Sequence, residues 1–145
     1  MVMSGEKMIV LLLIFATILS GCNTEPPEAE VVVNDDTEIS TFRGSYHWTE
    51  GAAEYDIPPQ LVQSEELERT EVDGGSIGTI VFDDGSDPSI SIQEWSENEP
   101  ISELNAVNNE VTFPEDPGTY IFEISAEWEG DLAKSASYTL YVEIV

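Results

Sequence analysis

Two segments near the C-terminal end of the chain alternate between apolar and polar side chains. In residues 118–128, the apolar side chains that share one face are Tyr120, Phe122, Ile124, Ala126 and Trp128. Residues 135–145 alternate in the same way. Because successive side chains of a strand point to opposite faces, the pattern predicts two antiparallel strands, each with one buried and one solvated face. Glu129-Gly130-Asp131 between them predicts the end of a hairpin.

Shorter strand-like runs precede this pair, and turn-forming residues separate them. They cover residues 39–49, 76–82, 89–95 and 110–114. Short strands bounded by Asp, Asn, Gly and Pro predict an all-β fold, an antiparallel sandwich. The one helical candidate, residues 58–72, begins with two prolines and has weak apolar spacing, so we expect a loop or at most one or two helical turns.

The N-terminal segment ends at the only cysteine of the chain. Residues 8–19 are apolar except for Thr17, and this run is too short to span a membrane but fits the apolar part of a secretion signal. Leu19-Ser20-Gly21-Cys22 resembles the lipobox of bacterial lipoprotein precursors. The resemblance implies a signal peptide over residues 1–21, cleavage before Cys22, and a thioether-linked diacylglycerol on the Cys22 thiol. The alternatives are an ordinary signal peptide that contains a cysteine, or a buried free cysteine.

The same resemblance implies a location and a domain plan. Residues 22–37 are acidic, contain Pro26-Pro27 and have few large apolar side chains, so we expect a disordered tether. Residues 38–145 then form the sandwich domain. Fatty-acyl chains such as palmitate on Cys22 would hold the protein at the outer side of the cell membrane, since two or more chains make a stable anchor.

The charge of the chain excludes one class of partner. Thirty acidic residues against four basic ones give a formal net charge of −26. Nucleic-acid binding needs clustered Lys and Arg, so we expect no nucleic-acid partner. The acidity fits either a cationic partner or metal ions, or a solvated surface suited to salty or alkaline surroundings. Because the acids are spread along the whole chain, the second interpretation is favoured.

A short motif at the start of the penultimate expected strand resembles a motif of immunoglobulin-like domains. Residues 116–122, DPGTYIF, are similar to the D-x-G-x-Y-x-C pattern that opens strand F of that family, with Phe122 at the cysteine position. The resemblance implies a hydrogen bond from the Tyr120 hydroxyl to nearby backbone and a core without a disulfide. The chain is also similar to small lipoproteins of Gram-positive-type bacteria that carry such a domain, which implies architecture and location but no activity.

The residue inventory argues against catalysis. The only histidine, His47, lies inside an expected strand, and the chain contains no G-x-S-x-G, H-E-x-x-H, C-x-x-C or P-loop motif. Paired carboxylates could serve a glycosidase, but with so many acids such pairs are expected by chance. We therefore predict a protein that is not an enzyme and holds no cofactor.

Aromatic and acidic residues supply the candidate binding sites. Trp95 lies on the face opposite Ile90 and Ile92, which makes it the best candidate for an exposed aromatic ligand contact. Tyr46 and Trp48 share one face of an expected strand and fit either the edge of the core or a binding surface. Trp128 fits the core.

An acidic loop is the candidate for a metal site. Residues 83–88, DDGSDP, include Asp83 and Asp87, whose carboxylates could bind Ca²⁺. No glutamate follows at the spacing of an EF-hand, so a β-turn is the favoured interpretation and no metal is expected.

These observations predict a non-catalytic binding or interaction module of the cell envelope, with a protein or glycan partner. The alternative is an acidic, cation-binding or charge-adapted structural protein of the cell surface. The membrane contact in either case is the lipid on Cys22.

Overall fold

The computed structural model describes residues 25–130 and 133–145. The expected signal peptide, residues 1–21, and the expected lipidation site Cys22 lie outside the described residues. Within the described ranges, no helix is both long enough and apolar enough to cross a membrane.

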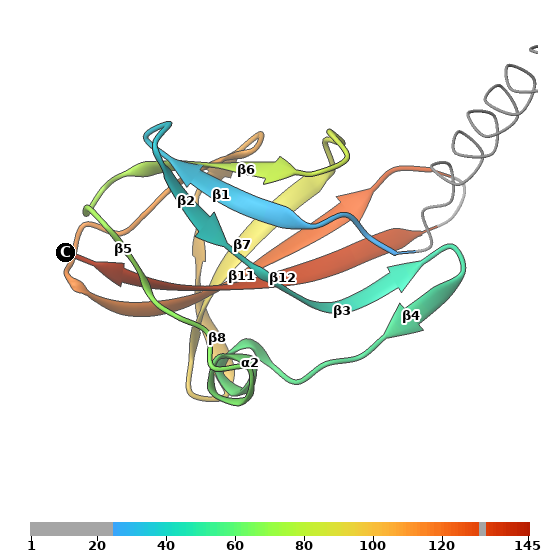
Figure 1. Ribbon diagram of the computed structural model, residues 1–145, viewed down its shortest axis with the longest axis horizontal. Helices are drawn as coiled ribbons and strands as arrows, with labels where there is room; N and C mark the ends of the chain where they lie inside the picture. Colours follow the sequence, from blue (N-terminus) through green and yellow to red (C-terminus); the bar gives the residue numbers. More distant parts are fainter. Residues whose placement is uncertain (1–24, 131–132) are drawn as a thin grey trace, which may run out of the picture.

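The smaller of two β-sheets has five strands in the order β2-β1-β6-β10-β9 (Figure 1). These strands are β1 (Ala29–Val33), β2 (Thr37–Ser40), β6 (Ile77–Phe82), β9 (Ala106–Val107) and β10 (Glu110–Thr112). Every neighbouring pair in this sheet is antiparallel.

The larger sheet has seven strands, six of them in the order β4-β3-β12-β11-β7-β8. Their bounds are β3 (Phe42–Trp48), β4 (Gly51–Ala53), β7 (Ser89–Ser96), β8 (Glu99–Leu104), β11 (Gly118–Trp128) and β12 (Lys134–Ile144). These six pair antiparallel, and the seventh, β5 (Thr70–Val72), pairs parallel with β12. The alternating segments of the C-terminal half thus form the central hairpin, β11 and β12, of this sheet.

The two sheets pack as layers (Figure 1). Their strand order follows the immunoglobulin-like connectivity. Strands β1, β6, β10 and β9 take the places of strands A, B, E and D, and β7, β11 and β12 take the places of C, F and G. Strand β8 adds a further strand beside β7. Residues 37–72, which carry β2 to β5, are inserted between the first two of these positions. The prediction of an all-β antiparallel sandwich is confirmed.

The core lies between the sheets and follows the predicted alternation. Phe122, Ile124 and Tyr138 are fully buried, and Ala136 and Leu140 are nearly so. The opposite sheet contributes the buried side chains Val31, Val33, Ile80, Phe82 and Val111. The described residues include no cysteine, so apolar packing rather than a disulfide holds this core together.

The expected corner at Tyr120 is present. The Tyr120 hydroxyl donates a hydrogen bond to the Asp116 carbonyl oxygen at 2.8 Å. The Tyr120 ring stacks on Phe122, with ring centroids 5.6 Å apart. Phe122 therefore fills the core at the point where the related pattern has a cysteine, and Phe113 packs against it from the other sheet.

The prediction of a disordered tether over residues 22–37 is wrong for most of that range. Residues 29–33 form β1, which pairs with both β2 and β6, and the Val31 side chain is fully buried. The run Ala29-Glu30-Val31-Val32-Val33 is rich in β-branched residues, which favour strands, and its two inward valines supply burial that outweighs its acidic surroundings. The domain accordingly begins before residue 38.

The segment that precedes β1 is also fixed to the domain. The Arg43 guanidinium donates to the Pro26 carbonyl oxygen at 2.6 Å and lies 3.1 Å from both the Glu25 and the Glu28 carboxylates. The Tyr138 hydroxyl donates to the Pro27 carbonyl oxygen at 2.6 Å. These contacts order the chain from Glu25 onward.

The helical segment is as short as predicted. Helix α2 (Pro58–Ser64) has seven residues, about two turns, with the prolines at its start. It contacts β7, β11 and β12 on the face of the larger sheet that is turned away from the smaller sheet, and it buries Pro58 and Leu61 (Figure 1). One end of this outer face is therefore covered, and the rest is open.

Candidate binding groove

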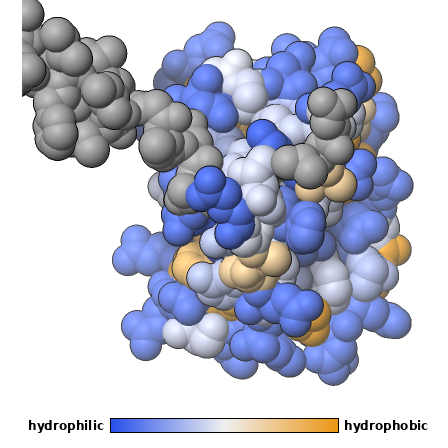
Figure 2. Space-filling model, turned by 90° about the vertical axis from the view of Figure 1, so that its right-hand side faces the viewer, coloured by the Kyte–Doolittle hydropathy of each residue, from blue (hydrophilic) through white to orange (hydrophobic). Residues whose placement is uncertain are grey.

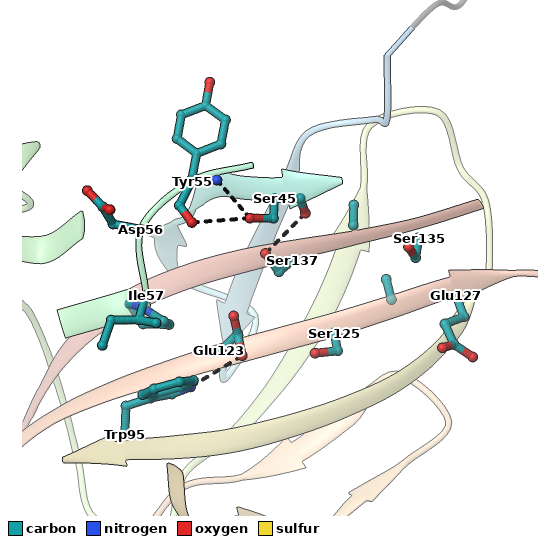
Figure 3. Close-up of a pocket in the computed structure, with 13 residues that line it drawn as sticks. Ser45, Tyr55, Asp56, Ile57, Trp95, Glu123, Ser125, Glu127, Ser135 and Ser137 are labelled. Atoms are coloured by element: carbon teal, nitrogen blue, oxygen red, sulfur yellow. Dashed lines mark hydrogen bonds between the residues drawn. The ribbon is translucent and has the colours of Figure 1, made fainter. Parts of the chain in front are cut away.

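A groove of about 370 Å³ lies on the outer face of the larger sheet, beside the start of α2 (Figure 3). Strands β11 and β12 form its floor, the segment 55–58 forms one wall, and Trp95 of β7 lies at one end. The polar side chains that line it are Ser45, Asp56, Glu123, Ser125, Glu127, Ser135 and Ser137. Every member except Asp56 stands on a strand, so the sheet itself sets the spacing.

The strand register explains why small hydroxyl groups gather there. On the outward face of β11 and β12, Ser125 lies opposite Ser137, and Glu127 lies opposite Ser135. Alternation sends the apolar neighbours of these residues into the core. A row of serines is left on the floor between two glutamates of the same strand, Glu123 and Glu127, which are separated by roughly 14 Å along it.

A tryptophan–glutamate pair closes one end of the groove. The Trp95 Nε1–H donates a hydrogen bond to Glu123 Oε1 at 3.2 Å (Figure 3). Burial raises the pKa of Glu123, and the hydrogen bond from Trp95 opposes that rise. The indole is half-buried on the outer face rather than freely exposed. The prediction thus located its face correctly, while the contact with Glu123 fixes its orientation.

Hydrogen bonds also hold the segment 55–58, which forms one wall of the groove, against β3. The Tyr55 backbone N–H donates to Ser45 Oγ at 2.9 Å, and Ser137 Oγ donates to the Ser45 carbonyl oxygen at 3.2 Å. The structure records no hydrogen bond from Ser125 or Ser135 to another described residue. Their hydroxyls face the groove and are available to a ligand.

A second hollow of about 200 Å³ adjoins the groove. It is lined by Ser89, Ile90, Ser91, Ser125 and Glu127. Ser125 and Glu127 of β11 belong to both hollows. The two hollows therefore form one continuous band, with polar side chains from β12, β11 and β7.

The other predicted aromatic candidates lie outside the groove. Trp48 is buried, packs edge-to-face on Trp128 at 5.0 Å, and has the Lys134 ammonium 4.9 Å from its ring centre. Tyr46 packs against the core, with the Arg43 guanidinium 5.4 Å from its ring centre. Both residues belong to the edge of the core.

The two predicted metal candidates lie in the β6–β7 turn and have different surroundings. Asp83 Oδ1 accepts a hydrogen bond from the Glu28 backbone N–H at 3.2 Å, which ties the β6–β7 turn to the start of β1. Asp87 lines a separate hollow with Asn108 and Asn109. Among the described residues, no group of three or more His, Cys, Asp or Glu side chains is placed to hold a metal ion.

The serines of the groove were not singled out from the sequence. Alternation placed Ser125 and Glu123 on a solvated face, but it did not show which residues of β12, β3 and the segment 55–58 would lie beside them. That arrangement depends on strand order and register across residues 45–137, which a local pattern does not contain.

The polar side chains of the groove can bind a ligand through hydrogen bonds. His47, the only imidazole in the chain, is exposed on β3 and does not line it. The polar groups of its lining are hydroxyls, carboxylates and one indole N–H, and most of them stand on strands. Comparisons with protein-family models, with curated proteins and with solved structures yield no match for this chain.

Proposed function

We propose that the protein is a lipid-anchored, extracytoplasmic lipoprotein whose sandwich domain is a non-catalytic binding module of the cell envelope. The observation that carries the binding role is the groove on the outer face of the larger sheet. There a hydrogen-bonded Trp95–Glu123 pair stands in a concave site beside Ser125 and Ser135, whose hydroxyls form no hydrogen bond with another described residue. Concave sites with few, well-placed polar groups are typical of ligand binding.

Two observations support the proposed lipid anchor: the lipobox-like sequence that ends at Cys22, and the few residues between Cys22 and the start of the ordered domain. Three peptide units separate Cys22 from Glu25, which Arg43 already holds to the domain. Three extended residues span roughly 10 Å. A lipid on Cys22 would therefore keep the domain close to the membrane surface rather than lift it on a long tether.

The non-catalytic role rests on the lining of the groove. A serine nucleophile needs a general base within hydrogen-bonding distance. Among the described residues, no hydrogen bond joins a serine of the groove to a carboxylate: Glu123 is bonded to the indole, and no histidine lines the groove. The side chains suit the recognition of a ligand.

Two experiments test the two parts of this proposal. Mass spectrometry of the mature N-terminal peptide should find diacylglycerol on Cys22, and an unmodified Cys22 would end the anchor. For binding, the mature chain carrying Cys22→Ser should sediment with isolated cell envelopes. Ser125→Tyr fills the groove with a residue that strands accept and should abolish sedimentation. Ser40→Tyr, at an exposed position of β2 in the other sheet, is the matched control and should retain it.

The alternative function is that of an acidic, cation-binding or charge-adapted surface protein. It is favoured by the surface itself: hydrophilic side chains cover most of the face in Figure 2, and the apolar ones form small separate patches. In that case Ser125→Tyr and Ser40→Tyr should behave alike, because a diffuse acidic surface does not depend on the groove.

A further inference from the structure

We propose that the groove binds the sugar units of an uncharged glycan chain. This inference rests on the proposed binding function and names its ligand class. It is argued from three properties of the site: its hydroxyl-rich floor, its aromatic end and the absence of lysine and arginine from the described residues that line it.

The floor matches a polyhydroxylated ligand. Serine hydroxyls donate and accept hydrogen bonds, as sugar hydroxyls do, so either partner can take either role. Ser125 and Ser135 form no side-chain hydrogen bond with another described residue, and Ser137 Oγ retains its acceptor capacity while it donates to the Ser45 carbonyl. Short side chains on strands also lose little conformational entropy when they bind.

The aromatic end matches the apolar face of a sugar ring. The Trp95 indole is orientated by its 3.2 Å bond to Glu123, so ligand binding need not order it. Aromatic rings combine a large apolar contact area with a polar edge, which suits a ligand with C–H and O–H groups. Glu123 keeps a second oxygen that can accept from a sugar hydroxyl, and hydrogen bonds to carboxylates are the stronger kind.

The dimensions match more than one sugar unit. The groove has a volume of about 370 Å³, and the adjoining hollow adds about 200 Å³ through Ser125 and Glu127. Volumes in this range accommodate small organic ligands. Because the two hollows form a band across three strands, the site fits a chain better than a single compact molecule.

The charge of the lining excludes anionic glycans. Asp56, Glu123 and Glu127 line the groove, and none of the described lysine and arginine residues does. A phosphate or carboxylate on the ligand would meet carboxylates without a compensating cation. The half-buried carboxylate of Glu123 already accepts a hydrogen bond from the Trp95 indole, and the described residues contain no group of three or more acidic, His or Cys side chains placed to hold a metal cation.

The test uses immobilised oligosaccharides and the mature chain carrying Cys22→Ser. The panel contains neutral gluco-, manno-, galacto-, xylo- and N-acetylglucosamine oligomers, with amino-sugar and uronic-acid oligomers of the same length. At least one neutral series should bind, with less than about a twofold change in affinity between 0.1 and 1 M sodium chloride, because screening leaves uncharged ligands unaffected. Uronic-acid oligomers should not bind.

Variants show whether that binding uses the groove. Trp95→Ala and Ser125→Tyr should each weaken it at least about tenfold, the effect of removing or blocking a central contact. Ser40→Tyr should change it less than about twofold. Thermal unfolding of each variant checks that the domain is folded. If Trp95→Ala is unfolded, the affinity of Ser125→Tyr decides whether binding uses the groove.

The outcomes separate this inference from the proposed function. If Ser125→Tyr abolishes envelope sedimentation but no neutral oligomer binds, the groove is a binding site and the ligand class is wrong. Binding confined to amino-sugar oligomers and lost in 1 M salt would also overturn the uncharged class. If the envelope itself is not bound, the proposed function fails.

Discussion

Single side chains fix both the strand corner and the groove of this domain. Tyr120 bonds to backbone four residues away, and Trp95 bonds to Glu123 on the neighbouring strand. The corner could be predicted from a local motif, because the hydrogen-bond donor and acceptor are close in sequence. The Trp95–Glu123 contact did not, because it spans 28 residues and depends on how β7 pairs with β11.

Replacing Tyr120 with Phe should lower the free energy of unfolding by about 0.5–1.5 kcal/mol, the usual contribution of one hydrogen bond. The bond is on the exposed side of the corner, so water can partly satisfy the Asp116 carbonyl that loses its donor. Urea unfolding measures the change. Tyr55→Phe, at a half-exposed tyrosine, is the control and should be neutral. Equal stability of Tyr120→Phe and wild type would argue against a stabilising corner.

Glu123 should make stability depend on pH. Burial raises its pKa, so the folded chain holds this proton more tightly than the unfolded chain. The associated stability is present below the ordinary glutamate pKa and is lost as pH rises through the folded value. Between about pH 4 and pH 7, wild type should therefore lose stability relative to Glu123→Gln, whose oxygen can still accept from Trp95.

Trp95→Phe should enhance the same loss, because it removes the hydrogen bond that opposes the pKa rise. Unfolding free energies measured across this pH range compare the three proteins. Identical pH profiles for wild type and Glu123→Gln would show that burial of Glu123 has no energetic consequence.

At the scale of strands and helices, the sequence predicted those elements that alternate over many residues. Strands β11 and β12 were found within a residue of their ends, since eleven-residue alternation is unambiguous. Strand β1 was missed because its valines stand among acids and prolines that favour disorder. Strand β8 was missed because its side chains are mostly exposed and include Pro100, so pairing with β7 rather than apolar burial defines it.

The pairing of β1 with β6 depends on one glycine. A Cβ atom at Gly78 would lie 2.6 Å from Val31 Cγ1 and 3.0 Å from Phe113 Cε2, inside the core. Gly78→Ala should therefore cost about 1–3 kcal/mol through overpacking. Gly51→Ala is the control, because nothing lies within 4 Å of its added Cβ, and it should stay within about 0.5 kcal/mol of wild type. Chemical denaturation distinguishes them, and equal stability would mean that the Val31 and Phe113 side chains move aside at little cost.

At the scale of the whole molecule, the large net negative charge sets how stability depends on salt. With a formal net charge of −26, mutual repulsion among carboxylates raises the free energy of the compact chain. Sodium chloride shortens the Debye length from about 10 Å at 0.1 M to about 3 Å at 1 M. The melting temperature of the mature chain carrying Cys22→Ser should therefore rise steadily with salt.

Calcium at constant ionic strength separates screening from a specific site. Melting curves with and without millimolar calcium, in excess sodium chloride, should nearly coincide. A saturable rise that a chelator reverses, and that is lost in Asp83→Asn or Asp87→Asn, would instead indicate a metal site in the β6–β7 turn, because only binding to the folded state gives such mass action.

The most direct test of groove binding is the indole N–H region of a nitrogen-15 NMR spectrum. The chain has three tryptophans, and Trp95 alone donates its indole N–H within the groove, while the Trp128 indole donates to Ser86. Trp95→Phe assigns the Trp95 signal. On addition of solubilised envelope material to the chain carrying Cys22→Ser, the Trp95 signal should shift or broaden, while those of Trp48 and Trp128 remain in place. An unchanged Trp95 signal, or changes confined to Trp48 and Trp128, would contradict binding at the groove.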